Sequence, residues 1–226
     1  MAPDVAGVLR RTVLLASAPE HELTALTAAA RLRTFRRGQV VCTAADPGET
    51  LMVVITGRLK IVVRSADGGE LTLTSVGPAG LVGEVSVADG GPRSADVEAI
   101  EDSEVLIVPR AVVQDLCGRV PSVALALAAS VAGTLRRLTE ATSDLVFLDL
   151  PRRVAKMLLA QPTDDAGQIQ PPVPQGELAR QVGGTRQSVN AALRAFERRG
   201  WIDIAGRSLI LREPGELARF AGELAT

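Results

Sequence analysis

The chain has very few of the residues that hold metals and disulfides. Cys42 and Cys117 are its only two cysteines and are far apart, so one chain cannot build a disulfide framework, a four-thiolate metal site or an iron–sulfur cluster. The only histidine, His21, stands at the expected start of a short helix, where a solvated or capping role is the simplest interpretation. We therefore expect two buried cysteines, no metal and no cofactor.

Long apolar runs are also missing. No stretch reaches the roughly 18 to 20 residues that a membrane-spanning helix needs, and the opening MAPDVAGVLRR lacks the apolar core of a secretion signal. With 226 residues, 46% of them hydrophobic, the chain can form one large domain or two modest ones. These features predict a cytoplasmic protein without a membrane partner.

Charge is divided unevenly along the chain. Residues 1–150 contain 14 Lys and Arg against 18 Asp and Glu, a net charge of −4, whereas residues 151–226 contain 11 against 8, a net charge of +3. A basic C-terminal part suits a polyanionic partner, although a solvated basic face would have the same composition.

Between Leu32 and Val108 the sequence consists of short β-branched runs separated by glycine. Apolar residues alternate at 59–63 and again at 71–73, and the residues between them at 66–69, ADGG, suit a hairpin turn. Many short strands of this kind predict a β-sandwich or barrel.

A long helix is predicted from about Ser122 to Leu148. Its side chains repeat at alternating four- and three-residue steps, as in the seam of a two-stranded coiled coil: Val131, Leu135, Leu138, Thr142 and Leu145. This pattern predicts a dimerisation helix and hence a homodimer. A helix packed on its own barrel is the alternative.

The C-terminal part has the pattern of a helix-turn-helix followed by a hairpin. Pro151 is expected to open one helix, and two more are predicted at 175–182 and 186–199, separated by the turn Gly183-Gly184-Thr185. The β-prone run after Gly200 predicts a small wing.

Two groups of polar residues are candidates for binding. Within residues 80–97 a glycine-bounded turn presents Glu84, Arg93 and Ser94, which are the carboxylate, cation and hydroxyl that a cyclic phosphate and a ribose require. An acidic surface turn is the alternative. The last predicted helix begins with polar side chains that can reach base edges in the major groove: Arg186, Gln187, Ser188 and Asn190.

Neighbouring residues of that helix have other expected roles. Thr185 suits the N-cap, and its hydroxyl can be shared with a phosphate. Arg207, at the tip of the wing, is a further candidate for a phosphate contact. On the opposite face, the spacing of Val189, Leu193 and Phe196 predicts core positions.

With Gly83-Glu84 followed by Arg93-Ser94-Ala95, the chain resembles the cyclic AMP receptor protein (Crp/Fnr) family. The similarity includes the segments VFLDLPRRVAKMLL and GGTRQSVNAALRAFERRGWI, whose sequences are most similar to those of the family's actinobacterial branch. The resemblance implies an α+β fold. It would consist of a cyclic-nucleotide-binding β-roll, a jelly-roll-like barrel, at 1–120, a dimerisation helix and hinge at 121–150, and a winged helix-turn-helix at 151–226.

The resemblance also implies roles in ligand binding. Glu84 would accept a hydrogen bond from the ribose 2′-hydroxyl, Arg93 would pair with the cyclic phosphate, and Ser94 with the N–H of Val85 would complete the cradle. The family places polar side chains of the dimerisation helix against the adenine amine, and these positions are Leu138 and Thr139 here. Because one polar contact is missing, cyclic AMP is the first expected ligand and cyclic GMP remains an alternative.

In the recognition helix, the resemblance assigns Arg186 to O6 and N7 of a guanine. Gln187 stands where the family usually has glutamate, and its amide suits adenine N6 and N7. We therefore predict a half-site that differs from the family's usual one at that base pair. Ala191 replaces a longer basic residue that is common in the family.

Together these features predict a transcription regulator under allosteric control, not an enzyme. The expected partners are a cyclic nucleotide, a second copy of the chain, palindromic double-stranded DNA and RNA polymerase. Leu138 motivates one alternative, a constitutive DNA-binding dimer whose barrel is only a scaffold. An enzyme regulated by a cyclic nucleotide would need a catalytic domain, but the residues after 151 offer no nucleophile–base pair or metal cluster.

Overall fold

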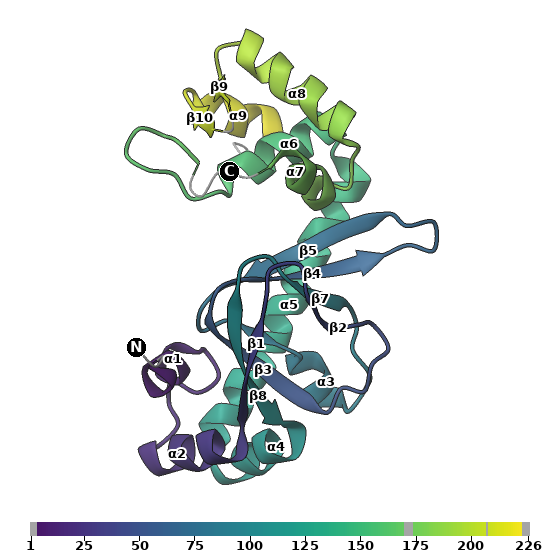
Figure 1. The fold of residues 1–226 in the computed structure, drawn as a ribbon. Coiled ribbons are helices and arrows are strands. Elements are labelled where there is room, and N and C mark those ends of the chain that lie inside the picture. The colour runs from purple at the N-terminus through teal and green to yellow at the C-terminus, as the bar shows by residue number, and fades with distance from the viewer. Residues whose placement is uncertain (1–3, 170–173, 207, 223–226) are drawn as a thin grey trace. The chain divides into compact units, whose positions relative to one another are not determined.

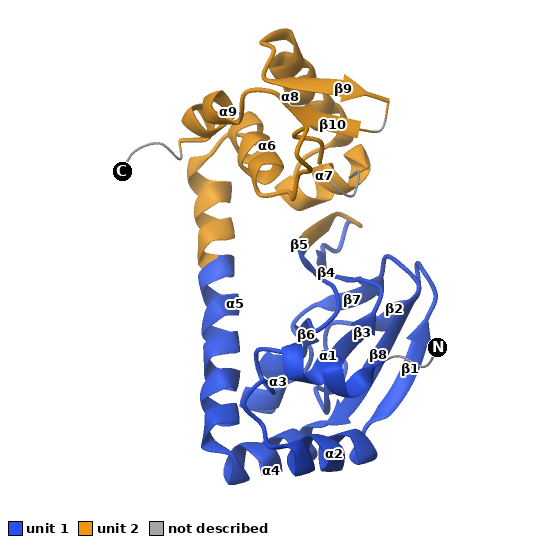
Figure 2. Ribbon diagram, turned by 90° about the vertical axis from the view of Figure 1, so that its left-hand side faces the viewer, with its two compact units in different colours: residues 1–67, 73–138 blue, residues 68–72, 139–226 orange. Residues whose placement is uncertain are grey.

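The computed structural model describes residues 4–169, 174–206 and 208–222, which form an α+β chain (Figure 1). It divides into two compact units, residues 1–67 with 73–138 and residues 68–72 with 139–226 (Figure 2). Arg207, the predicted contact at the wing tip, lies outside the described residues.

In its described residues the first unit is built on two four-stranded sheets, with the strand orders β1-β8-β3-β6 and β2-β7-β4-β5. The strands are β1 Arg31–Phe35, β2 Val40–Cys42, β3 Thr50–Thr56, β4 Leu59–Arg64, β5 Glu70–Val76, β6 Leu81–Val82, β7 Asp96–Ala99 and β8 Ser103–Pro109. The hairpin turn predicted at 66–69 lies between β4 and β5, and residues 68–72 at its tip cluster with the second unit. The prediction of many short strands is confirmed.

Strand β3 contributes side chains to two apolar clusters, one on each face of its sheet. Successive side chains of a strand point to opposite faces. Leu51, Val53 and Ile55 belong to the cluster of apolar side chains that includes the helices, whereas Met52 and Val54 belong to the cluster shared with the other sheet. Because both faces are covered, β3 is apolar along nearly its whole length rather than alternating.

Helices cover one side of this unit. They are α1 Val5–Arg11, α2 Glu20–Ala29, α3 Glu84–Asp89, α4 Arg110–Arg119 and the first part of α5 Pro121–Phe147. Helices α2 and α4 lie side by side, joined by a two-bond ion pair in which Arg119 donates to Glu22 at 2.9 and 2.8 Å (Figure 1). Helix α5 confirms the long helix predicted from about Ser122 to Leu148, because its ends lie within one residue of the predicted ones.

The second unit is a winged helix-turn-helix with an additional helix at its end. Its elements are α6 Leu150–Leu159, α7 Gln175–Val182, α8 Arg186–Arg198, β9 Ile202–Ala205, β10 Ser208–Leu211 and α9 Pro214–Ala221. Asp149 caps α6 by accepting a hydrogen bond from the N–H of Arg152 at 3.0 Å. Gly183, with φ of 62°, ends α7 in the left-handed conformation that glycine adopts readily.

The core of the second unit joins its helices to the wing. The predicted core residues Val189, Leu193 and Phe196 are all fully buried. The rings of Phe196, Trp201 and Phe220 have centroids 5.6 to 5.8 Å apart, so α9 packs against the recognition helix through aromatic contacts.

Two expectations need correction, and some helices were not expected at all. The segment predicted as a glycine-bounded turn around Glu84 contains the short helix α3. Helices α1, α4 and α9 were not predicted, because each has only about two to three turns of apolar periodicity. Cys42 and Cys117 are partly rather than fully buried, because Cys42 ends an edge strand and Cys117 lies on the flank of α4.

Candidate functional sites

Arg93 is the buried cation of the first candidate site. The residue is only 6% exposed. Its Nη2 donates hydrogen bonds to the carbonyl and the hydroxyl oxygen of Thr50, both at 2.7 Å, whereas its buried Nη1 has no hydrogen-bond partner among the described residues. Because a buried polar group without a partner is costly, this nitrogen favours an acceptor such as a phosphate oxygen.

Gly83 gives the guanidinium its space. It precedes α3 with φ of 92° and ψ of 14°, in the left-handed region that favours glycine. A Cβ atom at this position would overlap Nη1 of Arg93 and would lie 2.9 Å from the carbonyl oxygen of Thr50. The glycine of the Gly83-Glu84 pair is therefore required by a close approach as well as by its backbone angle.

Glu84 connects this site to the long helix. Its Oε1 accepts a hydrogen bond from the hydroxyl of Thr134 at 3.0 Å, and Nη2 of Arg137 donates to the same hydroxyl at 2.8 Å. Thr134 was not predicted as a site residue. It lies one turn before Leu138 on α5, so the helical period offered the only signal for it.

The remaining predicted ligand residues lie on α3, next to Arg93 in the chain, and on α5. Val85 lies in the first turn of α3 and is half-buried, and Ser94 directly follows Arg93 and is exposed. Leu138 and Thr139 are exposed on α5, one turn beyond the residue that contacts Glu84. Their contacts with a base remain predictions.

In the second unit, the turn before α8 presents polar side chains to solvent. The hydroxyl of Thr185 accepts a hydrogen bond from the N–H of Ser188 at 3.1 Å, which is the predicted N-cap. Arg186, Gln187 and Ser188 are exposed, and Asn190 is half-buried. The recognition helix thus places its polar end outward and its apolar face in the core.

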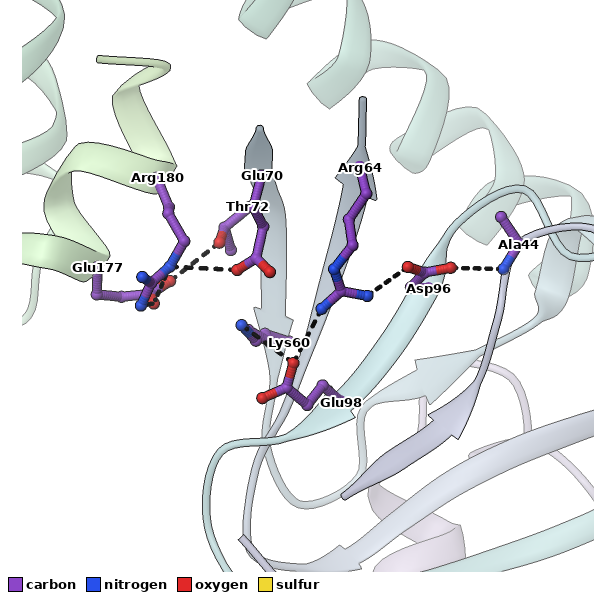
Figure 3. A network of polar contacts seen from close by, with 9 residues as sticks. All are labelled: Ala44, Lys60, Arg64, Glu70, Thr72, Asp96, Glu98, Glu177 and Arg180. Atoms are coloured by element: carbon purple, nitrogen blue, oxygen red, sulfur yellow. Dashed lines mark hydrogen bonds and ion pairs between the residues drawn. The ribbon is translucent and has the colours of Figure 1, made fainter. Parts of the chain in front are cut away.

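Helix α7 carries a second polar cluster of this unit (Figure 3). Arg180 pairs with Glu177 at 2.6 Å and with Glu70 at 3.2 Å. The hydroxyl of Thr72 donates a hydrogen bond to Glu177 at 3.0 Å. The hairpin residues 68–72 therefore contribute to the charge environment of α7.

Two features are absent from the residues that the structure describes. No group of three or more His, Cys, Asp or Glu side chains is arranged to hold a metal ion. No helix is both long and apolar enough to cross a membrane.

Comparison with known families assigns both units. Residues 32–119 match the cyclic nucleotide-binding domain, and residues 152–220 match the Crp-like helix-turn-helix domain. The protein is therefore a DNA-binding transcription regulator that a cyclic nucleotide controls.

Individual relatives agree with this assignment. The chain is 34% identical over 220 residues to the CRP-like cAMP-activated global transcriptional regulator of Mycobacterium tuberculosis, covering 95% of this chain and 98% of that protein. It is 33% identical over 208 residues to the cyclic AMP receptor protein of Thermus thermophilus, covering 92% and 95%. The structure of FixK2 from Bradyrhizobium japonicum superposes with a TM-score of 0.74 at 25% identity, covering 84% and 96%. The chain belongs to the Crp/Fnr family.

Proposed function

We propose that this regulator is a homodimer that binds cyclic AMP at Arg93 and Glu84 and reads a palindromic operator with α8. The observation that carries the ligand proposal is the buried Nη1 of Arg93, which lacks a partner among the described residues. Two relatives with similarity along most of the chain are named for their response to cyclic AMP. In this proposal residues 1–120 sense the ligand, 121–150 dimerise and 151–226 bind DNA.

The roles of the ligand residues follow from their chemistry. Arg93 binds the cyclic phosphate, and Ser94 with the N–H of Val85 adds hydrogen bonds to it. Glu84 accepts a hydrogen bond from the ribose 2′-hydroxyl. In this role the ribose hydroxyl competes with the hydroxyl of Thr134 for the same carboxylate. The base lies near Leu138 and Thr139, and cyclic GMP is the alternative ligand.

The dimer proposal depends on the exposed face of α5. Leu135, Leu138 and Leu145 are 65%, 41% and 44% exposed, and they follow the spacing of a coiled-coil seam. Apolar side chains gathered on one helix face are typical of an interface. Sedimentation of the full chain should show a dimer, and a Leu135→Lys variant should shift it toward monomer.

On DNA, Arg186 pairs with a guanine and Gln187 with an adenine, while Thr185, Ser188, Asn190 and Arg207 add contacts to bases or phosphates. RNA polymerase is the expected partner at the promoter, and the protein acts by binding rather than by catalysis. Selection from randomised palindromic duplexes tests this reading. Gln187→Glu should change the preferred base pair at one position of each half-site, whereas the control Arg198→Ala should leave the selected sequence unchanged.

Ligand and DNA binding are expected to be coupled by about 1 to 3 kcal/mol, and the coupling must be reciprocal. The segment 147–151 between α5 and α6 is the proposed hinge. Its carbonyl at Leu148 accepts a hydrogen bond from Arg153 at 2.9 Å, and Arg153 also donates to Val182 at the end of α7 at 3.0 Å. A change at the hinge can therefore reach the helix-turn-helix through one side chain.

Isothermal titration of the dimer with cyclic AMP and cyclic GMP, with and without the selected operator, tests the sensor. Cyclic AMP should bind, should bind more tightly in the presence of operator, and should lose affinity in Arg93→Ala. If neither nucleotide binds, the barrel is a scaffold and the regulator is constitutive. Equal affinity with and without operator would refute the coupling.

A further inference from the structure

The backbone of Arg93 is clamped by a neighbouring loop, residues 43–46 between β2 and β3. The N–H of Ala45 donates a hydrogen bond to the carbonyl of Arg93 at 3.0 Å, and the N–H of Arg93 donates to the carbonyl of Asp46 at 2.9 Å. The loop therefore holds the backbone from which the guanidinium extends.

The loop has an unusual backbone conformation. Ala45 has φ of 68°, in the left-handed region that residues other than glycine rarely adopt. Such a conformation persists only where surrounding contacts fix it. Part of that support is internal, because Oδ2 of Asp46 accepts from the N–H of Thr43 at 2.7 Å and the N–H of Asp46 donates to the carbonyl of Thr43 at 3.2 Å.

The external support comes from Asp96, the first residue of β7 and three residues after Arg93. Its Oδ1 accepts a hydrogen bond from the N–H of Ala44 at 2.6 Å. Its other oxygen pairs with Arg64 of β4, as Figure 3 shows. The hydrogen bond from Ala44, together with Arg64, lowers the pKa of Asp96, so this side chain is a carboxylate at neutral pH.

A second carboxylate stabilises the same arginine without contacting the loop. Glu98 accepts from Arg64 at 3.1 Å and pairs with the buried Lys60 at 3.3 Å (Figure 3). The two acidic residues of β7 thus share Arg64, but only Asp96 is joined to the segment that clamps Arg93. This difference provides a matched control.

We propose that Asp96, itself held by Arg64, is a positioning residue that fixes Arg93 for the ligand phosphate through loop 43–46. The consequence for the ligand rests on the proposed cyclic-nucleotide function. The consequence for Arg93 itself does not. The two can therefore be tested separately.

The first test needs no nucleotide. In ¹⁵N spectra of arginine side chains, the Nε–H signal of Arg93, identified by its loss in Arg93→Lys, should exchange slowly with solvent because the group is buried. Asp96→Ala should accelerate this exchange, Arg64→Ala should do so to a smaller degree, and Glu98→Gln should leave it unchanged. Unchanged exchange in Asp96→Ala would overturn the proposal. If that variant does not fold, Asp96→Asn tests the ion pair alone, because it keeps an acceptor for Ala44 but loses the charge that pairs with Arg64. Exchange should then accelerate to the smaller degree expected for Arg64→Ala, and exchange equal to that of Glu98→Gln would overturn the proposal.

The second test measures affinity for cyclic AMP by titration. Asp96→Ala should weaken binding by about tenfold, because a small displacement of a positioned group has effects of this order, while Glu98→Gln should bind like the wild type. In an Arg93→Ala background, which has no guanidinium to position, the Asp96→Ala effect should disappear, since the two residues act in one chain of contacts. The same loss of affinity in both backgrounds would show that Asp96 acts only on general stability and would overturn the proposal.

Failure of the wild type to bind any cyclic nucleotide would refute the sensor function, and the exchange measurement would still decide the role of Asp96.

Discussion

Replacing Gly83 by alanine should damage the ligand site through one added carbon atom. A residue other than glycine at this backbone angle costs roughly 1 to 2 kcal/mol. The new Cβ would also overlap Nη1 of Arg93, so the guanidinium would have to leave Thr50. Hydrogen bonds of charged groups contribute about 1.5 to 3 kcal/mol each, so losing two adds about 3 kcal/mol or more.

Gly90→Ala provides the control for backbone strain alone. Gly90 ends α3 with φ of 75°, but the nearest atom to a Cβ there is Nη1 of Arg110 at 3.5 Å, an ordinary contact. Calorimetric unfolding should therefore show a larger loss of unfolding free energy for Gly83→Ala than for Gly90→Ala.

Titration with cyclic AMP should separate the same two variants. Gly83→Ala should lose at least about tenfold in affinity, because one charged hydrogen bond to the phosphate corresponds to that factor or more. Gly90→Ala should bind like the wild type. Equal affinities or equal unfolding free energies in the two variants would refute the argument that Gly83 makes room for the guanidinium.

Three further predictions concern stability. Phe196→Ala should cost about 3 to 5 kcal/mol, because the ring is buried in the aromatic cluster, and the fluorescence of Trp201, the only tryptophan, reports unfolding in urea. Thr185→Ala removes the side-chain cap of α8 and should cost about 1 kcal/mol in the same assay, whereas Thr185→Ser should cost little. The hydrogen bond from Ala44 lowers the pKa of Asp96 below its ordinary value of 3.8. The stability that the Asp96 carboxylate contributes to the fold is therefore complete above pH 3.8 and is lost as the pH falls through the lower pKa of the folded state. Asp96→Asn should flatten this acid dependence of the melting temperature in thermal melts, and an unchanged dependence would contradict the role of the carboxylate.

The helix-turn-helix could be predicted closely because its signals are local. Gly183 and Gly200 mark the ends of two helices, and Thr185 caps the second. The apolar face of α8 repeats over more than three turns, which is long enough for its period to be read without any tertiary information.

Other features depend on contacts between distant parts of the sequence and left no local pattern. Thr134 meets Glu84 from 50 residues away, and Ala44 meets Asp96 from 52 residues away. Phe220 joins the aromatic cluster only because α9 folds back onto α6 and α8. A motif can name Glu84 and Arg93, but it cannot show which neighbours hold them.

The contacts of the buried arginine bear on the choice between a sensor and a scaffold. Arg119 and Arg64 are neutralised by carboxylates of Glu22 and of β7. In contrast, no carboxylate lies within 4 Å of Arg93 among the described residues, and its hydrogen-bond acceptors are the neutral oxygens of Thr50. Besides the hydrogen bond from the backbone of Thr43, the charge of Arg93 contributes to the lowered pKa of Asp46, but this interaction acts over a longer distance than an ion pair. Burying a positive charge that is incompletely compensated is costly. A barrel that served only as a scaffold would gain stability by replacing this arginine with an apolar side chain, whereas a sensor recovers the cost each time an anion binds. The buried Nη1 of Arg93, which has no hydrogen-bond partner among the described residues, therefore favours a barrel that binds an anionic ligand.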